Sequence, residues 1–251
     1  MHWLGSGLFA VALATMLAGC ASSPDRAGDA ILNASPWAKS NQLPIEGAAQ
    51  WRHQGIGTRP ASDYMPTRHA GRPALAAYSE RGDSLVRIPL LLEGPQLGQL
   101  RFSWFIDQLN PHADLADRHL DDAVARVILQ FGGDRSTFSG RDNMLSDLMQ
   151  AVTGEPLPFA TLMYVWDQRY PVGTVIPHAR SARIKTMVIE SGDARLGQWV
   201  DFDRDISADF EEAFGHAPQG LNGLALMTDS NNTKQSAKAW YGTMHWRPAR
   251  N

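Results

Sequence analysis

The sequence lacks several features that would point directly to a function. It has a single cysteine among 251 residues, so no disulfide can form within the chain. It also lacks a basic excess, because 23 Lys and Arg stand against 26 Asp and Glu, for a formal net charge of −3. The chain therefore has no excess of positive charge to attract a phosphate backbone, so nucleic acid is not an expected partner. Hydrophobic residues make up 43% of the chain, which is ordinary for a folded globular protein.

No catalytic signature is present either. The sequence contains no Gly-x-Ser-x-Gly elbow, no phosphate-binding loop, no His-Glu-x-x-His pair and no Cys-x-x-Cys pair. This absence leaves open an active site that is built from residues distant in sequence.

The N-terminus carries a targeting signal. The apolar run Leu8–Leu17 is too short to cross a bilayer, which needs roughly 20 residues, and has the length of the hydrophobic region of a signal peptide. The tetrapeptide LAGC at residues 17–20 resembles the lipobox of bacterial lipoproteins, although no Lys or Arg precedes the run. The resemblance implies that Cys20 receives acyl chains such as palmitate, which makes the membrane a partner through a lipid anchor. Ala21 stands where Asp would indicate inner-membrane retention, so we expect an outer-membrane lipoprotein that faces the periplasm.

The rest of the chain divides into a linker and a domain. Residues 21–43 are rich in Ser, Pro, Ala, Asp and Asn without a sustained period, which is typical of a flexible tether. From residue 47 onward, short apolar runs alternate with Gly, Pro, Asp and Asn. We therefore predict a signal peptide at 1–19, a lipidated N-terminus and tether at 20–46, and a single domain at 47–251.

Strand patterns dominate that domain. The clearest runs are Ser84–Leu92, Leu100–Ile106, Val124–Phe131, Thr161–Asp167, Ile184–Glu190, Trp199–Ile206, Leu221–Thr228 and Ala239–Trp246. The proline in the first run indicates an edge position or a bulge. Two helices are predicted, Asp142–Thr153 ending before Gly154 and Ser207–Phe214 ending before Gly215. The pattern predicts an all-β fold, a jelly-roll β-sandwich with two short helices.

Polar clusters mark two candidate ligand-binding regions. In the first, Asp121 and Asp122 precede a strand that carries Arg126. The arginine and an aspartate could bind a polar ligand together, with the guanidinium as donor and the carboxylate as acceptor, or they could form a structural ion pair with each other. The second is the run Thr228–Thr233, which contains Asp229, Asn231 and Asn232. It fails the EF-hand pattern, because Lys and Trp stand where Gly and Glu are required, so no metal site is predicted. A calcium site of another kind, a self-satisfied turn and a rim for sugar hydroxyls remain alternatives.

Aromatic and acidic side chains add further candidates. Trp166 and Trp240 lie beside polar loop residues, so they are the tryptophans best placed to stack on a sugar ring, although core burial is the alternative. Trp199, Asp201, Asp203 and Asp205 alternate along one strand. Such carboxylates do not converge on one ion, because same-face neighbours lie about 6.6 Å apart, so this face is interpreted as solvated.

Several stretches together resemble an uncharacterised bacterial family catalogued as domain of unknown function 3047. They are Asp117–Gly133, Leu162–Asp167, Pro171–His178, Val188–Gly215, Gly223–Thr233 and Ala239–Gly242. The resemblance implies exported or surface-associated proteins and similarity to galactose-binding-like jelly rolls. It implies no reaction, so no catalytic residues can be assigned from it.

Three hypotheses for function follow. The first is a ligand-binding, glycan-binding β-sandwich whose surface combines Asp121, Asp122, Arg126, Trp166, Asp229, Asn231, Asn232 and Trp240. The second is a hydrolase that acts on envelope glycans through paired carboxylates, with Asp122 and Asp229 as the pair to examine. The third is a structural or assembly module of the envelope.

Overall fold

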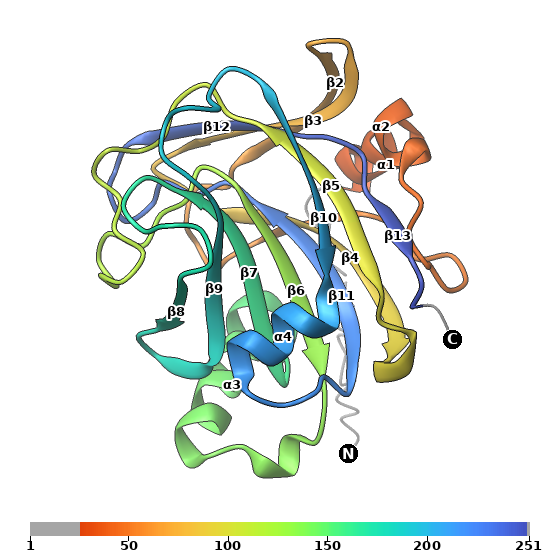
Figure 1. Ribbon diagram of the computed structural model, residues 1–251, viewed down its shortest axis with the longest axis vertical. Helices are drawn as coiled ribbons and strands as arrows, with labels where there is room; N and C mark the ends of the chain where they lie inside the picture. The colour runs from red at the N-terminus through yellow and green to blue at the C-terminus, as the bar shows by residue number, and fades with distance from the viewer. Residues whose placement is uncertain (1–25, 250–251) are drawn as a thin grey trace, which may run out of the picture.

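The computed structural model describes residues 26–249, in which two β-sheets pack face to face (Figure 1). The larger sheet has seven strands in the order β1-β4-β11-β6-β7-β9-β8. The smaller sheet runs β10-β5-β12-β3-β2, and β13 also pairs with β5. This arrangement confirms the predicted β-sandwich of the jelly-roll type. The predicted signal peptide and the predicted lipidation site, Cys20, lie outside the described residues.

The strands of the larger sheet are β1 (Arg52–Gly55), β4 (Ser84–Glu93), β6 (Arg126–Gly132), β7 (Ala160–Asp167), β8 (Val175–His178), β9 (Ser181–Ser191) and β11 (Gly220–Met227). Those of the smaller sheet are β2 (Asp63–His69), β3 (Arg72–Glu80), β5 (Gln99–Phe105), β10 (Trp199–Asp205), β12 (Ser236–Tyr241) and β13 (His245–Arg247). The α-helices are α1 (Arg26–Ala34), α2 (Pro36–Ser40), α3 (Gly140–Thr153) and α4 (Ile206–Phe214). The pairing of β7 with β9 is parallel, whereas the other strand pairs are antiparallel.

The core lies between the two sheets and is filled by alternate residues of their strands. Leu100, Phe102 and Trp104 of β5 point into it and are at most 3% exposed. The facing side chains of β6 are equally buried: Val127, Leu129 and Phe131. Both sets confirm the faces expected from the alternation, and each such side chain contributes about 1.5–3 kcal/mol when buried.

Pro89 shows how the larger sheet accommodates a proline within β4. Strand β1 pairs with β4 only from Ser84 to Arg87, so Pro89 lies beyond the end of this neighbour. On the other side of β4, the register with β11 shifts between Leu221 and Gly223, directly opposite Pro89. The sequence prediction offered an edge or a bulge, and the structure has both features at this residue.

The two predicted helices are present and end at the predicted residues, although α3 begins at Gly140, two residues before the predicted start. Helix α3 is capped by Ser139, whose side chain accepts a hydrogen bond from the Asp142 N–H, and it ends at Gly154 with φ of 80°. Helix α4 begins one residue earlier than predicted, because Asp205 rather than Ser207 provides the cap. Gly215 ends α4 with φ of 79°.

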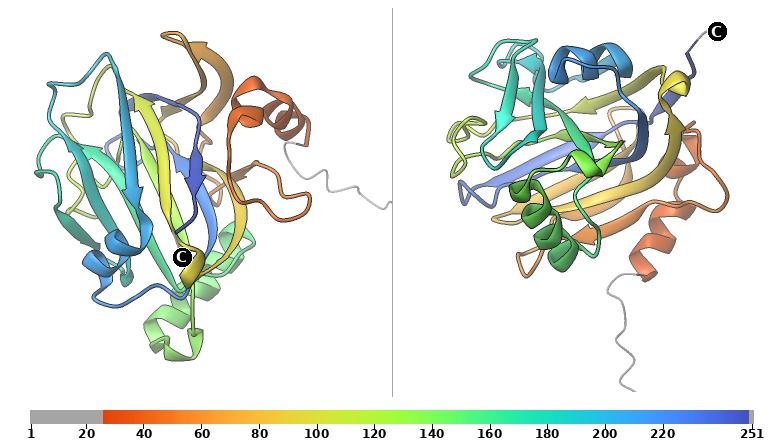
Figure 2. Two further views of the ribbon diagram at one scale, coloured as in Figure 1. Left: turned by 45° about the vertical axis from the view of Figure 1, so that its right-hand side comes forward. Right: turned by 90° about the horizontal axis from the view of Figure 1, so that it is seen from below.

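The segment expected to be a tether differs from the prediction in its described part. Helices α1 and α2 pack against one side of the sandwich (Figure 2). The Trp37 side chain is fully buried, its ring lies 5.1 Å from that of Trp51, and its indole N–H donates to the Gly242 carbonyl at 2.9 Å. Ser35 caps α2 ahead of Pro36, a start signal that the surrounding polar composition obscured. Between residues 26 and 249, no helix has the length and apolar character needed to span a bilayer.

Candidate functional site

The structure brings six of the eight predicted site residues together where β6 begins. Arg126 lies at the centre: its Nε donates to Asp229 at 3.1 Å and its Nη2 donates to Asp121 at 2.8 Å. The side chains of Arg126 and Asp229 are each only 3% exposed. Strand β6 starts at Arg126, so Asp122 does not share its strand face. The arginine instead reaches the other two carboxylates, and this geometry is that of a structural ion pair.

Asp122 anchors the Asp- and Asn-rich turn at residues 228–233 through hydrogen bonds. Its carboxylate accepts hydrogen bonds from the backbone N–H groups of Asn232 and Thr233 at 3.0 and 2.7 Å, and from the Thr233 hydroxyl at 2.6 Å. The side-chain amide of Asn232 donates to the Asp121 carbonyl at 2.9 Å, and that of Asn231 donates to Asn232. The turn is therefore satisfied by the protein itself. Among the described residues, no group of three or more His, Cys, Asp or Glu side chains is arranged to hold a metal ion.

Burial perturbs the ionisation of this network. It raises the pKa of Asp229 to about 7, against the opposing charge of Arg126. It also raises the pKa of the nearby Asp83 to about 6, against Arg59. Perturbed carboxylates often mark catalytic sites. Asp122 and Asp229 are however only 1% and 3% exposed, so neither presents its carboxylate to a substrate, and the hydrolase hypothesis gains no support from this pair.

A hydroxyl–imidazole pair elsewhere is similarly enclosed. Nε2 of His53 lies 2.9 Å from Oγ of Ser84, a geometry that a serine nucleophile and its base could share. Ser84 is fully buried, and its Oγ also accepts a hydrogen bond from the Ser62 N–H. This pair therefore holds β1 and β4 to the loop that precedes β2.

The two predicted tryptophans lie apart from the network. Trp166 is 2% exposed, and its indole donates to the Gly192 carbonyl at 2.8 Å, so its side chain is part of the hydrophobic core. Trp240 projects from β12 onto the outer face of the smaller sheet, in the same cluster as Phe105 and Trp199. The predicted eight-residue surface is thus divided among three places. The ligand-binding role of these residues stays a prediction.

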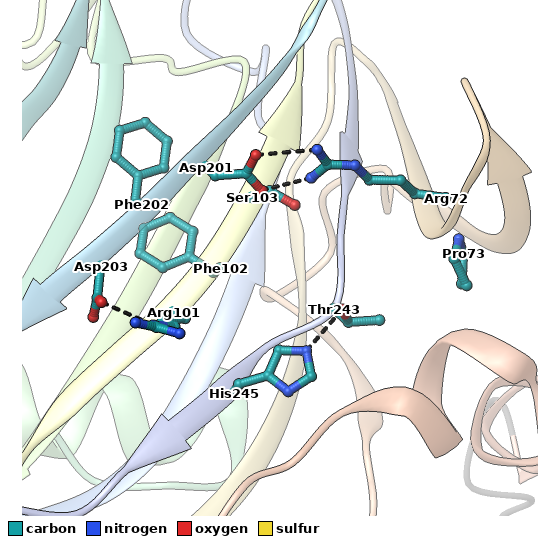
Figure 3. A pocket seen from close by; sticks show the side chains of 10 residues that line it. All are labelled: Arg72, Pro73, Arg101, Phe102, Ser103, Asp201, Phe202, Asp203, Thr243 and His245. Carbon is teal, nitrogen blue, oxygen red and sulfur yellow. Dashed lines mark hydrogen bonds and ion pairs between the residues drawn. The ribbon is translucent and has the colours of Figure 1, made fainter.

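A hollow on the outer face of the smaller sheet offers a more accessible site. The cavity, here called the outer groove, has a volume of about 490 Å³ and lies over β3, β5, β10 and β13 (Figure 3). Its lining residues are Arg72, Pro73, Arg101, Phe102, Ser103, Asp201, Phe202, Asp203, Thr243 and His245. Strand register explains the gathering, because Arg101 is paired with both Asp203 and His245, and Ser103 with Asp201. Residues so paired project from the same face of the sheet.

Opposite charges alternate across the outer groove. The Arg72 guanidinium donates to both carboxylate oxygens of Asp201, at 2.5 and 3.1 Å, and Arg101 donates to Asp203 at 2.8 Å (Figure 3). The four side chains are 37–64% exposed, so their pairing contributes at most about 1 kcal/mol each to stability. The Arg72 guanidinium also lies 5.3 Å from the ring centre of Trp199. The ion pairs and the contact with Trp199 hold these side chains in place, while the side chains stay accessible to solvent.

The outer groove contains residues that the sequence interpretation did not assign. The face of Trp199, Asp201 and Asp203 was expected to be solvated, and the structure confirms that the two carboxylates are exposed. Their arginine partners come from β3 and β5, which are distant in sequence. The alternation of aspartates along β10 was the available signal. The missing information was the strand order that places arginines beside them.

Comparison with known proteins identifies a family. The family described as "Protein of unknown function (DUF3047)" matches residues 49–245 of this chain. No curated protein shows significant similarity to the sequence.

Solved structures give more distant similarities. The xyloglucanase domain of NopAA, a type three effector from Sinorhizobium fredii solved with cellobiose, is 6% identical with a TM-score of 0.42, over 86% of this chain and 100% of that one. A mutant of ENZbleach xylanase is 8% identical with a TM-score of 0.40, over 86% and 89% of the respective chains. Carbohydrate-binding modules of the β-sandwich superfamily give 10% identity and a TM-score of 0.29, over 81% and 58%. The sequence match, which spans most of the chain, shows that this protein belongs to the DUF3047 family of proteins of unknown function.

Proposed function

We propose that this protein binds a glycan on the outer face of its smaller sheet. The observation that carries the proposal is the outer groove, where the half-buried ring of Trp199 adjoins an open cavity lined by Arg72, Asp201, Arg101 and Asp203. Sugar rings present apolar C–H faces that pack on aromatic rings. Their hydroxyl pairs suit planar guanidinium and carboxylate groups, which can donate and accept two hydrogen bonds each.

The charge of the outer groove indicates which glycans suit it. Within the outer groove Arg72 and Arg101 are balanced by Asp201 and Asp203, and Arg247, which donates to Asp203 at 3.3 Å, lines another cavity together with Asp205. This even balance suits neutral sugars, and either arginine can also pair with the carboxylate of an acidic sugar. A cavity of this size matches the clefts in which small ligands are usually bound.

The glycan-binding proposal is tested with the mature protein on an array of neutral and acidic polysaccharides. We expect Arg72→Ala and Asp201→Ala each to weaken binding of the selected glycan by about tenfold or more, because each removes one half of a charged hydrogen-bonding pair. Arg195→Ala is the matched control, since Arg195 is 46% exposed and pairs with Glu190 away from the outer groove. A folded protein that binds no glycan, or whose binding is equally insensitive to all three substitutions, contradicts the proposal.

We further propose that the protein is a lipoprotein anchored at Cys20, in the outer membrane and facing the periplasm. The support is the LAGC sequence at residues 17–20 and the alanine that follows it. Helix α1 begins at Arg26, only six residues after Cys20, and a chain extends at most about 3.6 Å per residue. The domain would therefore be held within roughly 20 Å of the lipid.

Cellular fractionation tests this second proposal. In a Gram-negative host, wild-type protein is expected to label with palmitate and to sediment with outer membranes. Cys20→Ser is expected to lose the label, because a hydroxyl cannot accept the lipid in place of the thiol. Unlabelled wild-type protein in the soluble fraction would exclude the anchor.

A further inference from the structure

A row of aromatic side chains crosses the outer face of the smaller sheet. Trp199 of β10 is paired in register with Phe105 of β5, and Phe105 is paired with Trp240 of β12. Their ring centres are 5.7 and 5.5 Å apart, so the three rings form one continuous strip, here called the aromatic row. The residues next to them in sequence, Trp104 beside Phe105 and Val200 beside Trp199, fill the core. The aromatic row therefore lies on the face away from the core.

The tip of the β2–β3 hairpin covers this row. The imidazole of His69 stacks on Trp240 with ring centres 3.8 Å apart and planes 11° apart, and meets Phe105 edge-on at 4.3 Å. Trp199 donates its indole N–H to the His69 carbonyl at 3.2 Å. Under this cover Phe105 and Trp240 are each only 7% exposed. In Figure 1 the hairpin bends out of the plane of the neighbouring strands at the top of the molecule.

His69 is poorly suited to the position that it fills. Its Nε2 is buried and has no hydrogen-bond partner among the described residues. An imidazole nitrogen without a partner is costly to bury, whereas a sugar ring in the same place would present C–H groups to Trp240 and keep its hydroxyls at the rim. The stack shows that the face of the Trp240 ring is oriented so that another ring can pack against it.

The hairpin that carries His69 is held weakly. Strand β2 is the edge of the sheet and pairs only with β3. The turn places Ala70 at φ of 41° and Gly71 at φ of 83°, and the left-handed region is unfavourable for alanine. Besides the stack, the tip is attached to β10 through the Trp199–His69 bond and the exposed Arg72–Asp201 pair. Edge elements with few buried contacts are the ones that open most readily.

Cavities lie on either side of the aromatic row. The outer groove is on one side, and on the other is a cavity of about 310 Å³ whose lining includes Tyr78, Asp107, Asn110, His112 and Lys238. Lys238 is two residues before Trp240 on β12, and its ammonium lies 4.6 Å from the Trp240 ring centre. Lifting the hairpin tip would join the two cavities through the aromatic row into one extended groove.

We propose that the ligand is an unbranched polysaccharide that occupies both cavities, and that one of its sugar rings displaces His69 from Trp240. This inference rests on the proposed glycan-binding function and adds to it the form of the ligand and a flap that regulates access. In the closed state His69 competes with the sugar. The apparent affinity therefore equals the affinity of the open state multiplied by the fraction of molecules that are open. Short oligosaccharides that fill one cavity gain nothing from opening.

The test measures the binding of cellohexaose, chitohexaose and hexagalacturonate, with their disaccharides, by calorimetry. We expect at least one hexamer to bind at least tenfold more tightly than its disaccharide, and His69→Ala to tighten that hexamer about tenfold by removing the competing ring. Trp240→Ala is expected to abolish the difference between hexamer and disaccharide. Met65→Ala is the matched control, because Met65 lies on the same strand, β2, with a side chain that is 67% exposed.

A second measurement does not depend on any substitution. The ring protons of His69 in the wild-type protein should move toward their unstacked chemical shifts when the hexamer saturates the site. Hexamer binding that leaves both the His69 resonances and the His69→Ala affinity unchanged, while Arg101→Ala in the outer groove weakens it, overturns the flap and leaves the proposed function standing. Absence of binding by every probe to every variant overturns both.

Discussion

Replacement of Arg126 by methionine is expected to lower the free energy of unfolding by about 3–5 kcal/mol at pH 8, the range seen when one partner of a buried ion pair is removed. The methionine would leave the Asp229 carboxylate, which is 3% exposed, without its cation. Asp229 would also lose its connection through Arg126 to Asp121. Chemical denaturation at fixed pH measures the change.

The cost of Arg126→Met should be smaller at pH 5 than at pH 8. Burial raises the pKa of Asp229 to about 7, so between roughly pH 4 and 7 the folded state binds a proton that the unfolded state releases, and stability falls as pH rises through this window. Loss of Arg126 removes the charge that opposes this rise in the pKa of Asp229. The pH range over which stability falls therefore extends to higher pH in the variant. Arg195→Met, which breaks an exposed pair with Glu190, should cost less than about 1 kcal/mol at either pH. Equal effects of the two substitutions would contradict the structural role of the buried network.

Truncation of Trp37 to alanine is expected to destabilise the domain by about 3–5 kcal/mol, as for other large aromatic side chains deleted from a core. Trp37 is fully buried where α2 packs against the sandwich, its ring lies tilted beside that of Trp51, and its indole donates to the Gly242 carbonyl. Its removal creates a cavity and leaves that carbonyl without its donor. Thermal and chemical unfolding of the protein provide the measurement.

The control for Trp37→Ala is Ile31→Ala in the neighbouring helix α1. Ile31 is 68% exposed, so its truncation should change stability by less than about 0.5 kcal/mol. A near-zero effect of both substitutions would mean that residues 26–46 behave as the tether that their composition suggested. A large effect of Trp37→Ala alone would show that the folded domain includes this segment.

The sequence carried enough information for the core of the fold. Alternation placed Leu100, Phe102 and Trp104 on one buried face, because side chains in a strand point alternately to opposite sides. The glycine ends of α3 and α4 were also readable, since Gly154 and Gly215 occupy left-handed positions that favour glycine. These features depend on residues close in sequence.

The missed features depend on contacts between distant segments. Helix α2 is five residues long, too short to produce a helical period, and it is stabilised by Trp37 contacts with strands far along the chain. The partners of Arg126 were foreseeable as carboxylates, but the strand start that selects Asp121 and Asp229 over Asp122 was not. The outer groove required the strand order, because Arg72 and Asp201 are 129 positions apart. Local patterns indicate which residues face solvent, whereas the sheet topology determines which of them meet.

Glycan binding on the outer face is tested most directly by the response of the indole N–H resonances to a bound glycan in the ¹⁵N-labelled protein. On titration with the hexasaccharide that binds, the indole signals of Trp199 and Trp240 are predicted to shift, because their rings lie on the outer face beside the outer groove. Those of Trp37 and Trp104, which are fully buried in the core, should stay in place. Binding that moves neither the Trp199 nor the Trp240 signal would place the glycan elsewhere on the molecule and contradict binding at the outer groove.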